Sequence, residues 1–242
     1  MNLIVEHMPP ALRLAARDAR DRALVVRRSS ALSANLQILN TTLRQAGVID
    51  KAWVTGGLLL GWARLGEPLR NDLQDADFGF MEADQSAIRA GLTALIEAGF
   101  RPAKRWRRND GSTSEWSLMR DGVQVDFFEY RDCGDHLEVW GYFPAGSNWD
   151  DWQASSGEEI LQSRLLLPQQ PLVPFELLER TWFKHADHKR ELDSLYGPSW
   201  RAPDKQFYKA RGWSTGRDSP AVAERTIWKR SAICWDGSID GP

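Results

Sequence analysis

Apolar side chains at helical spacing predict two helices in the first hundred residues. The first lies in a stretch without proline, residues 11–45, and Gly47 offers a stop just after it. Its leucines recur every three or four positions, which places them on one helix face: Leu32, Leu36, Leu39 and Leu43. A second stripe ends before Gly99 and consists of Ile88, Leu92, Leu95 and Ile96. We therefore expect two helices that each pack on a core through one face.

The segment between these helices changes from apolar to mixed character. Residues 51–55 (KAWVT) predict a short strand that runs into a glycine pair and then into one or two helical turns, residues 58–63. Residues 75–80 (DADFGF) predict a second strand. Because successive side chains of a strand point to opposite faces, Asp75 and Asp77 are expected to share one face.

Short alternating segments separated by turn signals follow and predict a run of hairpins, with strands at residues 100–107, 114–119, 123–130 and 136–143. The dipeptide Asp121-Gly122 suits a two-residue loop, so the strand carrying Asp126 should lie antiparallel to its predecessor. Helical signals return in residues 175–195, and the sequence beyond Pro203 is polar and weakly patterned. This order predicts the α/β (α+β) class, a mixed sheet flanked by helices, with an N-terminal helix and a C-terminal helical region.

Charge and composition narrow the range of partners. The 242 residues carry 31 basic and 33 acidic side chains, a formal net charge of −2, so an anionic partner must be held by a local site and no nucleic acid is expected. Basic side chains in the first half of the first helix allow at most peripheral membrane contact: Arg13, Arg17, Arg20, Arg27 and Arg28. Two cysteines make no disulfide framework, and we find no apolar run of about 20 residues and no secretory leader, which favours a cytoplasmic protein.

Three aspartates on packed strands predict a metal site. Asp75 and Asp77 share a strand face, and Asp126 lies in the apolar run VDFF of a later strand. Carboxylates among apolar neighbours need a partner charge, and a D-x-D pair beside a third carboxylate is able to hold one or two divalent cations next to a phosphate. We assign Asp75, Asp77 and Asp126 as catalytic and metal-binding residues, with Mg²⁺ or Mn²⁺ as the expected cofactor.

Glycines and cations predict a phosphate site beside this metal. Gly56 and Gly57 directly precede a helix, where free backbone N–H groups and the helix dipole favour phosphate oxygens. Arg64, about two turns along that helix, offers a bidentate contact. Lys184, in the predicted C-terminal helix, offers a further cation, and a solvated helix surface is the competing interpretation.

The glycine pair before a helix, the D-x-D on the next strand and the later lone aspartate resemble the ordered signature of the nucleotidyltransferase fold. Residues 56–66 (GGLLLGWARLG) are more closely similar to the G-x-L-L-G-x-x-R-x-G segment of the LicD/fukutin-related family, in which a D-x-D follows. Residues 192–203 (LDSLYGPSWRAP) resemble that family's Y-G-x-x-W-x-x-P segment. Two departures are Leu58, where the family commonly has Thr, and residues 71–74 (NDLQ), where it has an acidic lead into the D-x-D.

This resemblance covers roughly residues 50–205 and implies phosphoryl-group transfer from an activated nucleotide. Together with the patterns above, it predicts an N-terminal helical segment (1–48), a nucleotidyltransferase-like catalytic domain with a helical C-terminal part (49–204) and a C-terminal tail (205–242) that we expect to be loosely attached or partly disordered. Family members are similar to phosphocholine or polyol-phosphate transferases. The implied partners are therefore a CDP-activated small-molecule donor and a hydroxyl group of a glycan or lipid-linked glycan.

Two other function classes stay open at this point. A nucleotidyltransferase that moves NMP from an NTP to a small molecule, a protein or RNA needs the same metal site, and the basic clusters at residues 104–108 and 205–211 suit a phosphate-bearing strand. An exposed hairpin edge is the competing interpretation of the first cluster. A non-catalytic binding module is the other class, and three adjacent carboxylates argue against it because their mutual repulsion must be offset.

Overall fold

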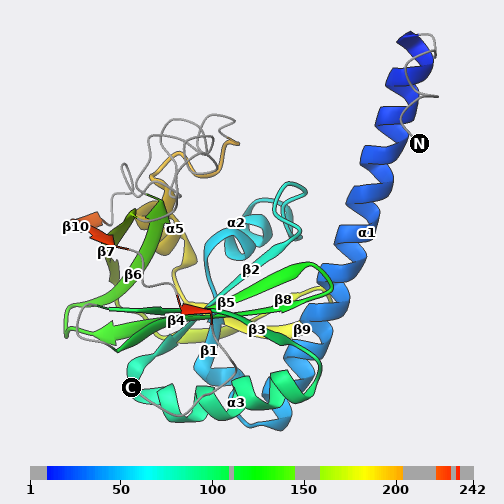
Figure 1. The fold of residues 1–242 in the computed structure, drawn as a ribbon. Helices are drawn as coiled ribbons and strands as arrows, with labels where there is room; N and C mark the ends of the chain where they lie inside the picture. The colour runs from blue at the N-terminus through cyan, green and yellow to red at the C-terminus, as the bar shows by residue number, and fades with distance from the viewer. Residues whose placement is uncertain (1–9, 109–111, 145–158, 204–221, 230–232, 235–242) are drawn as a thin grey trace.

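The computed structural model describes residues 10–108, 112–144, 159–203, 222–229 and 233–234. In chain order the elements are α1 (Pro10–Gln45), η1 (Ile49–Lys51), β1 (Ala52–Val54), α2 (Gly56–Leu65), β2 (Asp75–Met81), η2 (Glu82–Asp84), α3 (Gln85–Glu97), β3 (Arg101–Arg107), β4 (Thr113–Arg120), β5 (Val123–Asp132), β6 (His136–Pro144), β7 (Glu159–Pro168), β8 (Leu172–Leu177), β9 (Arg180–His185), α5 (His188–Tyr196), β10 (Val222–Lys229) and β11 (Ile233–Cys234). Helices lie on both sides of a mixed sheet (Figure 1), which confirms the predicted α/β class.

The sheet is organised around β5. Its strand order is β10-β7-β6-β5-β4-β3-β11, while β2 also pairs with β5 and β1 pairs with β2. The β2–β5 pair is parallel, and the other pairs of this sheet are antiparallel. The tight turn predicted at Asp121-Gly122 joins β4 to β5, and both of its residues have positive φ, 50° and 78°. The prediction that the strand carrying Asp126 lies antiparallel to the preceding strand is therefore confirmed.

The two faces of the sheet around β2 and β5 have opposite character. Phe78 and Phe127 stack on each other at 5.5 Å within a core that includes buried side chains of α1 and α3. Asp77 and Asp126 are the preceding residues of the same strands, so period-two geometry points them to the other face. In Figure 1, α3 lies below the sheet and α2 above it. One face therefore builds the larger core cluster, and the other carries the carboxylates beside a second cluster that includes Phe128 and Tyr130 of β5.

Helix α1 packs on the body mainly through its second half. The predicted stripe is buried, with exposed fractions of 2% or less for Leu32, Leu36, Leu39 and Leu43. Residues 19–23 are exposed, and Figure 1 shows the first half of α1 extending away from the sheet. The prediction of a helix over residues 11–45 is confirmed.

The predicted helix over residues 175–195 is wrong in its first part. β8 and β9 form an antiparallel hairpin, in which Phe175 pairs with Trp182, and only α5 is helical. The hairpin turns at Leu178 and Glu179, which both have left-handed φ values of 52° and 58° without the glycine or asparagine that normally marks such a turn. Trp182, 1% exposed, packs against Phe78 of β2, so tertiary burial overrides the local helical preference.

The region predicted as a C-terminal tail contributes strands to the sheet. β10 pairs with β7 along Val222–Lys229, and β11 pairs with β3 through Ile233 and Cys234. The described part of residues 205–242 therefore lies at the two edges of the sheet. The predicted division of the chain into a helical segment, a catalytic domain and a tail stays a prediction.

Candidate active site

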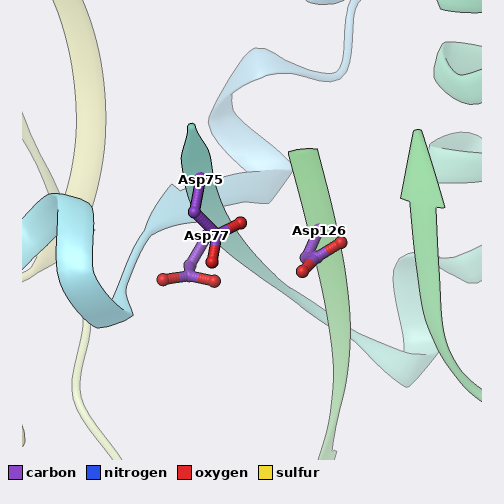
Figure 2. Close-up of side chains that lie close together, drawn as sticks. All are labelled: Asp75, Asp77 and Asp126. Atoms are coloured by element: carbon purple, nitrogen blue, oxygen red, sulfur yellow. The ribbon is translucent and has the colours of Figure 1, made fainter. Parts of the chain in front are cut away.

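Asp75, Asp77 and Asp126, called the aspartate triad below, meet across the parallel pair β2–β5. Asp77 lies directly opposite Asp126 in the register, and Asp75 lies opposite Gln124. Figure 2 shows Asp75 and Asp77 on β2 next to Asp126 on the neighbouring strand β5. One carboxylate oxygen of each aspartate lies within 4.8 Å of those of the other two. The structure thus brings together all three residues that the sequence predicted as metal ligands.

The glycine pair at the start of α2 fits against these carboxylates. The backbone N–H of Gly57 donates to Asp77 Oδ2 at 2.9 Å. A Cβ atom at Gly56, where φ is +56°, would lie 2.2 Å from Asp77 Oδ2, and one at Gly57 would lie 2.0 Å from Asp72 Oδ2. The position of Gly56 therefore requires glycine, because its left-handed φ and the approach of Asp77 both oppose a side chain, whereas a side chain at Gly57 would displace the end of Asp72. The hydrogen bond from Gly57 N–H fixes the orientation of Asp77. The phosphate-binding role predicted for Gly56 and Gly57 stays a prediction.

Replacing Gly56 by Ala is expected to displace Asp77 and to weaken Mn²⁺ binding by about tenfold or more, because a methyl group takes the position of the carboxylate. Gly47→Ala is the matched control, since Gly47 has a similar φ of +69° with open space around its Cβ position. In both variants the left-handed φ costs alanine about 1 kcal/mol. Only in Gly56→Ala does the added Cβ also collide with the Asp77 carboxylate. Isothermal titration with Mn²⁺ checks this, and equal affinities for the two variants would contradict it.

Burial raises the pKa of every aspartate in the triad. The pKa of Asp75 rises to about 8 because the side chain is desolvated and faces the charge of Asp126. The pKa of Asp77 is raised well above its usual range, first by burial and then by the charges of Asp75 and Asp126. Burial also raises the pKa of Asp126, against hydrogen bonds from Ser117 and Gln124 that favour the carboxylate. The triad therefore needs additional positive charge to exist in its ionised form at neutral pH.

Two further carboxylates, Asp72 and Glu115, lie near the triad and were not predicted as site residues. Asp72 precedes β2 and approaches Gly57. Glu115 of β4 is 6% exposed and accepts a hydrogen bond from Ser117 Oγ at 3.2 Å. Ser117 pairs with Asp126, so Glu115, two residues away on β4, shares the face of the triad. Strand alternation placed Glu115 and Ser117 on one face, but the register that sets them beside Asp126 is not visible in the sequence.

The aspartate triad fits a divalent cation. Its carboxylates are the hard oxygen ligands that Mg²⁺ and Mn²⁺ prefer, and they gather buried like charges that such an ion offsets. Asp75, Asp77 and Asp126 would hold the ion. When bound there, it supplies charge neutralisation and orientation of phosphate oxygens.

Arg64 connects the two segments that carry the family resemblance. Its Nε donates to the carbonyl of Trp200 at 2.5 Å, and its Nη2 donates to the carbonyl of Ala202 at 3.1 Å. Trp200 Nε1 in turn donates to Asp193 Oδ1 at 2.8 Å. The guanidinium thus links α2 to the segment after α5, and its predicted phosphate contact stays a prediction.

Lys184 lies on β9 and not on a helix, so the predicted location of this residue is wrong. Its side chain is buried against Trp62, with Nζ 5.4 Å from the centre of that ring, 3.3 Å from the carbonyl of His185 and 3.2 Å from His188 Nδ1. Burial lowers the pKa of Lys184. Its predicted phosphate contact stays a prediction.

A buried polar network supports the backbone just before the glycine pair. Thr55 Oγ1 donates to Glu191 Oε1 at 2.5 Å, and His185 Nδ1 lies 2.8 Å from Glu191 Oε2. The N–H of Thr55 also donates to the carbonyl of Asp77 at 3.1 Å. Glu191, a fully buried residue of α5, therefore joins the end of β1 to α5 and β9, while the backbone of Thr55 joins it to β2, and sequence patterning gave no signal for Glu191.

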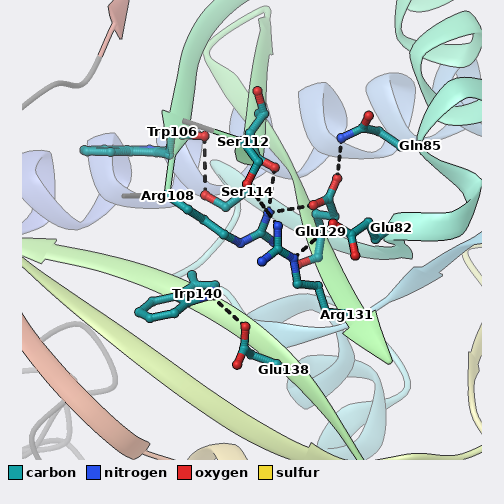
Figure 3. Close-up of polar contacts among 11 residues, drawn as sticks. Glu82, Gln85, Trp106, Arg108, Ser112, Ser114, Glu129, Arg131, Glu138 and Trp140 are labelled. Atoms are coloured by element: carbon teal, nitrogen blue, oxygen red, sulfur yellow. Dashed lines mark hydrogen bonds and ion pairs between the residues drawn. The ribbon is translucent and has the colours of Figure 1, made fainter. Parts of the chain in front are cut away.

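The basic cluster at residues 104–108 is not a continuous cationic surface. Arg105 and Arg108 are 8% and 4% exposed. Arg108 Nη1 forms an ion pair with Glu129 Oε1 at 2.6 Å, and Gln85 Nε2 donates to Glu129 Oε2 at 2.6 Å (Figure 3). β3 is also covered by β11, so the exposed hairpin edge is not observed. The second basic cluster, residues 205–211, lies outside the described residues.

Glu129→Gln is expected to lower the free energy of unfolding by about 3 kcal/mol, because it leaves the buried Arg108 guanidinium without its counter-charge. Glu82→Gln is the control, since Glu82 pairs with Arg131 at 3.0 Å but is about half exposed, and we expect a change below about 0.5 kcal/mol. Urea denaturation of both variants measures the difference. Equal losses would show that Arg108–Glu129 is not a structural ion pair.

Comparisons with known proteins give little further information. No protein-family model matches the chain, and no curated protein matches it. Among solved structures, the chain is similar to the lincosamide antibiotic adenylyltransferase LnuA with lincomycin bound, at 12% sequence identity and a TM-score of 0.34, over 58% of this chain and 73% of that one. A likeness this distant carries no argument about activity, so a functional assignment depends on the geometry of the site. Within the described residues, no helix has the length and apolar character to cross a membrane.

Proposed function

We propose that this protein is a metal-dependent transferase that moves a phosphorus-containing group from a nucleotide-activated donor to a hydroxyl group. The observation that carries the proposal is the aspartate triad, whose ligand oxygens gather within 4.8 Å on the face of the sheet next to the start of α2. Buried carboxylates lose their hydration and repel one another, so a cluster of them destabilises a protein unless a bound ligand neutralises their charge. A cation with a phosphate-bearing substrate is a ligand of the required charge and hardness.

In this proposal each residue of the aspartate triad has its own role in binding the donor or the acceptor. Asp75 and Asp77 would hold the cation, which would neutralise charge on the donor phosphates, and Gly57 N–H orients Asp77. Asp126 completes the site and is placed to orient the acceptor hydroxyl, with its own oxygens fixed by Gln124 Nε2 at 2.8 and 3.1 Å. In group transfers of this kind, positioning and charge neutralisation supply most of the rate enhancement.

The donor we propose is a CDP conjugate of an alcohol, such as phosphocholine or a polyol phosphate, and the acceptor is a glycan hydroxyl. This choice follows from the two segments that resemble the LicD/fukutin-related family. In support, Arg64 of the first segment hydrogen-bonds to Trp200 and Ala202 of the second, so the two form one structural unit beside the site.

Thermal unfolding with a panel of donors tests this proposal. We expect CDP-choline or CDP-ribitol with Mg²⁺ to stabilise the protein, since a ligand at a hundred times its Kd contributes about 2.7 kcal/mol. Stabilisation by CTP, ATP, GTP or UTP instead would identify a nucleotidyltransferase that uses an NTP. Stabilisation by no nucleotide, or stabilisation that persists in EDTA, would contradict the proposed activity and favour a non-catalytic role.

A further inference from the structure

One row of side chains extends the aspartate triad across the sheet. Asp77 of β2 pairs with Asp126 of β5, Asp126 pairs with Ser117 of β4, and Ser117 pairs with Lys104 of β3. Directly paired residues of neighbouring strands point to the same face of a sheet. Lys104 therefore points to the face that carries the triad, two strands away from Asp126.

Lys104 is within reach of the space above the triad. Neighbouring strands lie about 4.8 Å apart, so the backbone of Lys104 is about 10 Å from that of Asp126. Ser117, which lies between them, is short, and the flexible four-carbon stem of a lysine is able to extend over it. Lys104 is exposed, and its side chain forms no hydrogen bond or ion pair with another of the described residues. Its ammonium group is available for a ligand.

The charge of Lys104 already acts on this site. Burial is the main cause of the raised pKa values of Asp126 and Glu115, and the positive charge of Lys104 opposes that rise in both. By contrast, Arg64 donates to the carbonyls of Trp200 and Ala202, and the Lys184 ammonium lies against α5. The two cations predicted from the sequence thus have protein partners, whereas Lys104 faces the carboxylates.

We infer that Lys104 binds the phosphate groups of the donor on the β3 side of the aspartate triad. This inference rests on the proposed function and identifies the residue that selects a polyanionic donor at that site. A donor with two phosphates brings negative charge to a face that already carries the triad and Glu115, and a cation beyond the metal is needed to hold it. Lys104 offers this charge as a mobile point cation, the common form of phosphate recognition by lysine.

Binding of inorganic pyrophosphate to the Mn²⁺-loaded protein, measured by isothermal titration, tests the inference without requiring turnover. We expect Lys104→Met to weaken pyrophosphate binding by about tenfold or more, as loss of a charge-assisted hydrogen bond implies, and to leave the affinity for Mn²⁺ alone within about twofold. Lys104→Arg should restore most of the pyrophosphate affinity. Lys189→Met, which removes an exposed cation from α5, is the matched control and should bind pyrophosphate like the wild type.

Three results would overturn the inference. They are unchanged pyrophosphate affinity in Lys104→Met, an equal loss in Lys189→Met, and a wild-type protein that binds Mn²⁺ but no pyrophosphate. Failure of the proposed function has a different signature, since a protein that binds pyrophosphate through Lys104 but consumes no nucleotide donor would refute the transferase activity and not the phosphate site. If a donor is consumed, Lys104→Met should raise KM for the donor more than it changes the Mn²⁺ requirement.

Discussion

Asp77→Asn is expected to lower metal-dependent turnover by about a hundredfold or more and to make the metal-free protein more stable. Asn keeps the shape of the side chain and still accepts the hydrogen bond from Gly57 N–H, but it carries no charge for a cation. In the wild type, Asp77 is buried beside Asp75 and Asp126, so its ionised form destabilises the folded state. Asparagine is neutral without binding a proton, and the variant therefore lacks this destabilising charge. A gain in stability together with a loss of activity is the pattern expected of a functional carboxylate.

The control for this variant is Asp121→Asn, at an exposed turn position with φ of 50° that asparagine also accepts. It should leave both turnover and stability close to those of the wild type. Thermal unfolding in EDTA and a donor-consumption assay in Mg²⁺ measure the two quantities. An Asp77→Asn protein that unfolds at a lower temperature in EDTA, or that retains activity, would show that Asp77 has a structural role only.

The stability of the metal-free protein is expected to fall as the pH rises from 5 to 8. The pKa of Asp75 is about 8 in the folded protein and near 4 when unfolded, so the folded state holds a proton that the unfolded state has released. The stabilisation from this proton is fully present below the unfolded pKa and is lost as the pH rises through the folded pKa. We expect a loss of about 3 kcal/mol across this window, less than full ionisation of an isolated group would give, because the aspartates titrate together.

A divalent cation should reverse this trend, since it replaces the proton as the neutralising charge. Urea denaturation at pH 5, 6.5 and 8, with EDTA or with Mg²⁺, measures the effect, and the stabilisation by metal should be greatest at pH 8. In Asp75→Asn the pH dependence in EDTA should be smaller than in the wild type. Parallel pH profiles with and without Mg²⁺ would refute metal binding by the triad.

Local signals in the sequence predicted the parts of the site that depend on one element. The D-x-D spacing places Asp75 and Asp77 on one face of β2, and the Asp121-Gly122 turn fixes β5 as antiparallel to β4. The apolar surroundings of Asp126 indicated a packed strand. These features follow from period-two geometry and turn chemistry, which short windows of sequence contain.

Parts of the site that depend on pairing between distant strands were not predictable in this way. Glu115 and Lys104 join the triad only through the registers of β4 with β5 and of β3 with β4. Glu191 reaches Thr55 across 136 positions of sequence. A one-residue change of register would turn these side chains to the other face, and no local pattern fixes that choice.

The β8–β9 hairpin shows the same limit for secondary structure. Residues 175–180 (FELLER) have side chains that favour a helix, and no turn residue interrupts them. Burial of Trp182 against Phe78 stabilises the hairpin from outside the segment. The same rearrangement moved Lys184 from a predicted helix to a strand, and with it the direction of its side chain.

The most direct test of metal-dependent transfer from a nucleotide donor is ³¹P NMR of CDP-choline, CDP-ribitol and the four NTPs, each incubated with the wild-type protein and Mg²⁺. The proposed site predicts that at least one donor is consumed, that EDTA stops the reaction, and that Asp77→Asn slows it by about a hundredfold or more. A folded, Mn²⁺-binding protein that consumes no donor, or one that consumes a donor equally well in EDTA, would contradict this assignment.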